Sequence, residues 1–102
     1  MKRVTPTLPP ADPLTLDPVV FGQAIRAART AAGMTLVNAA EMMGVSKQTL
    51  SDLEKATGSV GLVIALRVAR DLGVGVFTVQ PMQREAARQA LLNQACPLQE
   101  QP

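Results

Sequence analysis

The most informative part of the sequence runs from Leu36 to Lys55 and reads LVNAAEMMGVSKQTLSDLEK. Both of its halves carry apolar residues at helical spacing, and Gly44 separates them. A glycine at this point supplies the positive backbone angle that a tight turn between two helices requires. Thr35 and Ser46 precede the two halves, and both residue types cap the N-termini of helices. We therefore predict two short helices joined by a turn, over residues 36–43 and 47–55.

The apolar residues of this stretch fall where two crossing helices must pack. Ala40 stands at the expected crossing point, where only a small side chain fits. The positions that must be buried beneath the pair are Ala39, Met43, Val45, Leu50 and Leu53. The polar residues of the second helix, Lys47 to Asp52, are then left on its outer side. This layout is typical of a helix-turn-helix, whose second helix enters the DNA major groove. A helical hairpin with a purely structural role is the alternative.

Further helices are predicted on both sides of this pair. Asp17 and Pro18 are favoured residues at a helix start, and Gly33 is a plausible stop for the helix that they begin. A fourth helix is expected over about residues 61–72, and Gly73 ends it. Residues 82–93 favour a final helix.

Residues 74–80 read VGVFTVQ and predict a short strand that Pro81 ends. An isolated strand leaves its backbone donors and acceptors unpaired, so it needs a partner. We expect that partner to be the same segment of a second copy, related by a two-fold axis; pairing with residues 3–8 is the alternative. The expected dimer interface consists of Val74, Val76, Phe77 and Val79. Helix 61–72 carries more apolar residues than one core face needs, which also fits a subunit interface.

The chain thus divides into three expected segments. Residues 1–16 hold four prolines and predict an extended arm, which is either a solvated leader or an arm that reaches DNA or a partner. Residues 17–80 form the helix-turn-helix domain, including the dimerisation strand 74–80. Residues 81–102 form a C-terminal helix and tail.

Composition excludes most catalytic functions. The 102 residues include no His and one Cys, so the usual general base, a cysteine zinc site and an intramolecular disulfide are all missing. We expect no catalytic residues, no metal, no cofactor and no enzyme activity, and a free thiol of no consequence at Cys96. A net charge of +2 permits nucleic-acid binding without demanding it. No apolar run approaches the roughly 18 residues of a membrane span, and no secretion signal is visible, so we expect no membrane partner and a cytoplasmic location. Met42 and Met43 are both expected to fill the core.

From Phe21 to Leu72 the chain resembles the Xre/Cro/lambda-repressor family of DNA-binding domains. The matching strings are FGQAIRAARTAAGMT, AAEMMGVSKQTLSDLEK and LRVARDLGV. The continuation into VGVFTVQP resembles HipB-type antitoxins, in which a strand after the fourth helix pairs across the dimer. The implied fold is all-α: a lambda-repressor-like helix-turn-helix domain of four to five helices, plus one short C-terminal strand that pairs across a homodimer.

The resemblance implies a sequence-specific repressor that binds double-stranded DNA as a homodimer on a palindromic operator. The alternative is a HipB-type antitoxin that also neutralises a HipA-like kinase toxin while repressing its own operon. The implied base readers are Lys47, Gln48, Ser51 and Asp52, because Lys can donate to guanine and Gln can pair with adenine. Asp52 can accept from cytosine, or it can repel phosphate. The implied phosphate contacts are Thr35, Asn38, Ser46, Thr49 and Lys55.

Two further positions follow from the resemblance. Arg29 and Glu54 are implied to form a structural ion pair that ties the first helix to the recognition helix. Leu36 occupies a place where the family usually carries a Gln that contacts phosphate. Because Leu36 cannot donate a hydrogen bond, other donors such as Thr35 and Asn38 must replace it, or affinity is lower.

Overall fold

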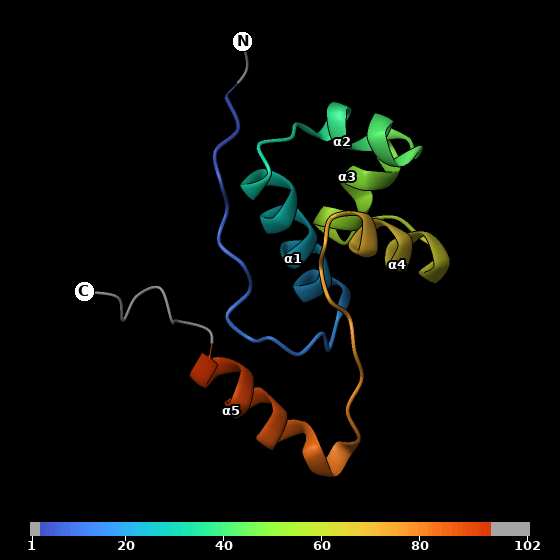
Figure 1. Cartoon of the computed structure of the whole chain (residues 1–102). Helices are drawn as coiled ribbons and strands as arrows, with labels where there is room; N and C mark the ends of the chain where they lie inside the picture. Colours follow the sequence, from blue (N-terminus) through green and yellow to red (C-terminus); the bar gives the residue numbers. More distant parts are fainter. Residues whose placement is uncertain (1–2, 95–102) are drawn as a thin grey trace, which may run out of the picture.

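The computed structural model describes residues 3–94, and all the regular elements in this range are helices (Figure 1). The predicted all-α class with four to five helices is confirmed, and the described residues form five α-helices. The elements are α1 (Pro18–Ala31), α2 (Leu36–Met43), α3 (Lys47–Lys55), α4 (Leu62–Asp71), the 3-10 turn η1 (Pro81–Gln83) and α5 (Arg84–Gln94). The predictions for Met1, Lys2 and residues 95–102, Cys96 included, lie outside the described residues.

Short polar side chains start the first three helices, as their sequence predicted. The Asp17 carboxylate accepts from the Val20 N–H at 3.0 Å and begins α1. Thr35 and Ser46 do the same for α2 and α3, at 3.1 and 2.9 Å from the amides three residues on. Gly44 ends α2 in the left-handed conformation with φ +71°. These local interactions place the turn between α2 and α3 where the helix-turn-helix pattern requires it.

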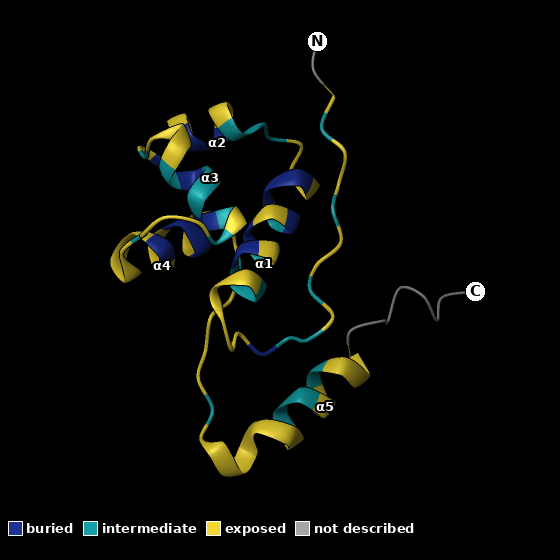
Figure 2. Cartoon of the chain, turned by 180° about the vertical axis from the view of Figure 1, so that it is seen from behind, coloured by how far each residue is buried: buried dark blue, intermediate teal, exposed yellow. Residues whose placement is uncertain are grey.

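One aliphatic core holds the first four helices together, and α3 packs against both α1 and α2. In Figure 2 the buried residues gather on the facing sides of these helices, whereas α5 carries none. The core consists of Ile25, Ala39, Ala40, Met43, Leu50, Leu53, Ala65, Val68 and Ala69. The expectation for Met42 is wrong, because its side chain is 59% exposed. Of the two methionines, Met43 is the one that lies on the inner face of α2.

Gly22 lets α1 approach α3 closely, and the sequence pattern did not reveal this. A Cβ atom at Gly22 would lie 2.5 Å from the carbonyl oxygen of Glu54 and 2.6 Å from that of Leu53. Both oxygens belong to backbone, which cannot move aside without shifting α3. The position therefore accepts only glycine at this helix spacing.

The expected strand at residues 74–80 is wrong: the described residues contain no β-strand, and this segment connects α4 to η1 (Figure 1). The alternative pairing with residues 3–8 does not form either. The physical reason is that a strand needs an edge to pair with, and residues 3–94 of a single copy offer none. Val74 packs against the core instead, while Val76 and Phe77 are 45% and 57% exposed.

The N-terminal arm is extended, as its prolines predicted, but it differs from a solvated leader. The Thr7 N–H donates to the Thr30 hydroxyl of α1 at 2.9 Å, and Leu14 is buried. The Arg88 guanidinium of α5 donates to the Asp12 carboxylate at 3.1 Å. That hydrogen bond, with a further one from the Leu14 amide, lowers the pKa of Asp12 below its ordinary value. The arm therefore links α5 to the helical core.

Candidate nucleic-acid interface

A buried ion pair fixes α3 against α1. The Arg29 guanidinium donates to the Glu54 carboxylate through Nε at 2.6 Å and through Nη2 at 2.9 Å. Its Nη1 donates to the Met34 carbonyl at 2.8 Å. The two charged side chains are only 8% and 4% exposed. One guanidinium thus ties together α1, the loop before α2 and the end of α3, which is the structural role that the resemblance implied.

The inner face of α3 is anchored in the core, which determines what its outer face presents. Leu50 and Leu53 are 0% and 8% exposed beneath the helix. At 100° per residue, positions 47, 48, 51, 52 and 55 then share the outer face. Lys47, Gln48 and Lys55 are exposed there, whereas Ser51 and Asp52 are half-buried. All four residues assigned to base reading therefore lie on one side of one helix.

Asp52 is engaged with its own protein rather than free on this face. Its Oδ1 atom accepts from Gln48 Nε2 at 2.9 Å and from the Thr57 hydroxyl at 3.0 Å. Its Oδ2 atom lies against Gly58 in the loop that follows α3. Asp52 therefore orients the Gln48 amide and braces that loop. Sequence reasoning missed Thr57, because nothing in the local pattern shows that the loop folds back onto α3.

The residues assigned to phosphate contact divide into separate groups. Ser46 caps α3, and its hydroxyl also donates to the Thr49 hydroxyl at 2.8 Å, so these two form one unit at the start of the helix. Thr35 caps α2 and borders the same hollow as Lys47. Asn38 is exposed on α2, and Lys55 is exposed at the far end of α3, about 12 Å along the axis from Lys47.

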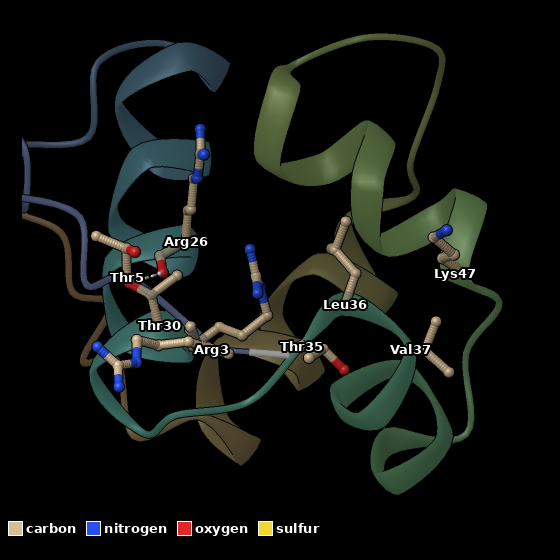
Figure 3. Close-up of a pocket in the computed structure, with 10 residues that line it drawn as sticks. Arg3, Thr5, Arg26, Thr30, Thr35, Leu36, Val37 and Lys47 are labelled. Carbon is tan, nitrogen blue, oxygen red and sulfur yellow. Dashed lines mark hydrogen bonds between the residues drawn. The ribbon is translucent and has the colours of Figure 1, made fainter. Parts of the chain in front are cut away.

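A hollow of about 500 Å³ beside Lys47 brings in residues that the sequence analysis did not assign (Figure 3). Arg26 of α1 and Arg3 of the arm line it. Leu36 also lines it, while packing against the core as a half-buried side chain. In the sequence, the only indication that Arg26 lies near this surface is its place one helical turn before Arg29.

The described residues offer no chemistry beyond donors and acceptors at this surface. Residues 3–94 contain no group of three or more His, Cys, Asp or Glu side chains arranged to hold a metal ion. Every buried side-chain nitrogen and oxygen in that range has a hydrogen-bond partner. No helix in it is long and apolar enough to cross a membrane.

Comparison with known proteins agrees with this geometry. The model of the helix-turn-helix family matches residues 25–78, which include α2, the turn and α3. The chain belongs to this family. A relative from Methanothermobacter thermautotrophicus, named an uncharacterized HTH-type transcriptional regulator, is 45% identical over 49 residues, or 48% of this chain and 71% of the relative.

Proposed function

We propose that this protein is a sequence-specific double-stranded DNA-binding regulator of transcription. The observation that carries the proposal is the outer face of α3, which presents Lys47 and Gln48 to solvent while Leu50 and Leu53 hold the helix in the core. A rigid helix with exposed donors near its N-terminus suits the DNA major groove. Membership of the helix-turn-helix family and the name of the Methanothermobacter relative support the same function.

The proposed readers are Lys47 and Gln48, with Ser51 one turn further along the helix. Asp52 acts on bases through Gln48, whose amide it orients, rather than as a separate reader. Ser46, Thr49, Thr35, Asn38 and Lys55 are the proposed phosphate contacts.

In vitro selection of bound duplexes tests the proposal. The purified chain is expected to enrich a defined motif, and Lys47→Ala or Gln48→Ala is expected to relax base preference within it. Each good base contact is worth about 1–3 kcal/mol of discrimination. Arg84→Ala is the matched control, because Arg84 is an exposed cation on α5, away from α2 and α3 (Figure 1). Equal preference in all three variants contradicts the assignment of the reading face.

We further propose that the protein acts as a homodimer on a two-fold symmetric operator and represses by excluding RNA polymerase. An exposed apolar face on α4 supports the dimer: Leu62, Val63 and Leu66 are 72%, 83% and 41% exposed. Leu66 and Val76 border the same hollow, so residues after α4 extend this face. A single chain gains nothing by exposing such a patch, whereas a second copy would bury it. Two copies would place recognition helices about 34 Å apart, one turn of DNA.

Sedimentation of Val63→Asp tests the dimer. A carboxylate in the proposed interface is expected to give a folded monomer with weaker operator binding. Val19→Asp is the matched control, since Val19 is 55% exposed on α1 and lies off the α4 face. A wild-type chain that sediments as a monomer, or a V63D variant that still dimerises, contradicts this interface.

The HipB-type antitoxin role follows only from the narrower resemblance and stays a prediction. Its test is co-purification of the chain with a HipA-like kinase encoded beside it. A stable complex in which kinase activity falls would support the role, and separate elution would count against it.

A further inference from the structure

The hollow beside Lys47 is built from four separate parts of the chain. Arg3 and Thr5 come from the arm, Arg26 from α1, and Thr35 and Leu36 from the start of α2. Lys47, the first residue of α3, completes the wall. Figure 3 shows Leu36 between Arg26 and Lys47, and all three side chains line the same hollow.

The lining of this hollow is cationic, without an acidic residue to balance it. Arg3, Arg26 and Lys47 are exposed, and within residues 3–94 none of them takes part in an ion pair. The fourth cation of the wall, Arg29, is already neutralised by Glu54. The whole chain has a net charge of only +2, so these three cations around one hollow are a local concentration of charge. Like charges repel one another, and an anion bound among these cations offsets their electrostatic repulsion.

The arm is held in place at this hollow by specific contacts. The Thr7 N–H donates to Thr30 Oγ1, and that hydroxyl donates in turn to the Arg26 carbonyl at 2.9 Å. The arm is thus fixed to the same turn of α1 that carries Arg26. Arg3 lies four residues before the anchor at Thr7, so it reaches the hollow without a long flexible tether.

We propose that this hollow binds a phosphate of the DNA backbone, with Arg3 and Arg26 as its phosphate-binding residues. The inference rests on the proposed DNA-binding function and extends it to a part of the chain outside the helix-turn-helix. A guanidinium presents paired N–H donors that match two phosphate oxygens. Lys47 links the two surfaces, since it lines the hollow and also begins the helix that faces the bases. Leu36 cannot donate a hydrogen bond, so the arginines supply donors that this side chain lacks.

The salt dependence of DNA binding tests this site. Arg3→Gln and Arg26→Gln are compared with Arg84→Gln, which removes the same charge from α5. Each variant is titrated, over several salt concentrations, with the duplex selected by the wild-type chain and with a scrambled duplex. The slope of log K against log salt is expected to flatten by about 0.9 for each phosphate that the variant no longer neutralises, hence about 1.8 for a dimer. Affinity for both duplexes should fall by a similar factor, leaving base preference intact.

The outcomes separate this site from the proposed function. If the wild-type chain binds no duplex, the proposed function itself fails. If the wild-type chain binds but R3Q and R26Q keep the salt slope of R84Q, only the phosphate site is overturned. A titration with inorganic pyrophosphate, followed by NMR, distinguishes a free anion from DNA. One outcome would assign the hollow to a small anion rather than to DNA phosphate. In that outcome pyrophosphate causes saturable chemical-shift changes that R26Q abolishes, while R26Q leaves the salt dependence of DNA binding unchanged.

Discussion

The Arg29–Glu54 pair makes a quantitative prediction about folding. Glu54→Gln keeps the size of the side chain but removes its charge, so the result reports on electrostatics rather than on a cavity. Arg29 would stay buried, at 8% exposure, with its three donors directed at a neutral amide and the Met34 carbonyl. Removing one partner of a buried ion pair lowers the free energy of unfolding by about 3–5 kcal/mol. Because the amide oxygen still accepts one hydrogen bond, we expect a loss of about 3 kcal/mol in the free energy of unfolding.

Thermal and urea unfolding followed by circular dichroism measure this loss. A domain of this size loses about 4–8 °C of Tm for each kcal/mol, so the expected fall is roughly 12–24 °C. The double variant R29M/E54L should recover much of the loss, because no unpaired charge is then left buried. Asp71→Ala is the surface control: its pair with Arg70 spans 3.8 Å with the Arg70 side chain 78% exposed, and removing it should change stability very little. A loss below about 1 kcal/mol in E54Q would show that the charge of Glu54 is not needed to compensate the buried Arg29.

Three further predictions concern other parts of the fold. Gly22→Ala should destabilise the domain by more than about 1 kcal/mol, because its Cβ would meet the Glu54 carbonyl oxygen at 2.5 Å, and chemical denaturation measures the loss. Asp52→Ala should change base preference where Gln48 reads, whereas Asp52→Asn, which keeps an acceptor oxygen, should not; competition binding with single-base operator variants distinguishes the two. The hydrogen bond from Arg88 lowers the pKa of Asp12 from its ordinary value of 3.8. The stabilising contact between Asp12 and α5 is therefore fully present above pH 3.8 and is lost as pH falls through the lowered pKa of the folded protein. An NMR titration of α5 resonances should show this transition in the wild-type chain, and D12N should retain only the transition of Glu85, whose pKa is also lowered, by Gln89 and Arg88.

The helix boundaries were predictable because their causes are local. Asp17, Thr35 and Ser46 accept hydrogen bonds from amides three residues away. Gly44 adopts the positive φ that the turn requires at this residue. The buried positions of α2 and α3 follow from helical periodicity for the same reason. The prediction that Met42 fills the core was wrong, because hydropathy alone does not distinguish two neighbouring methionines whose side chains point in different directions.

The features that sequence reasoning missed depend on contacts between distant parts of the chain. Gly22 matters only because α3 lies against it, and Asp52 is occupied only because the loop at Thr57 folds back. Arg3 reaches the hollow beside Lys47 only because the arm is anchored at Thr7. The expected strand at 74–80 failed for the converse reason: its β-branched composition is a local signal, but a strand exists only where a second segment pairs with it.

A crystal structure of the chain with the duplex that it selects shows directly whether α3 reads the bases. We expect α3 to lie in the major groove, with Lys47 Nζ and the Gln48 amide within hydrogen-bond distance of base edges. The carboxylate of Asp52 should lie behind Gln48 and keep its hydrogen bond to the Gln48 amide. A complex in which α3 faces away from the duplex, or in which another helix occupies the groove, would rule out α3 as the reading helix.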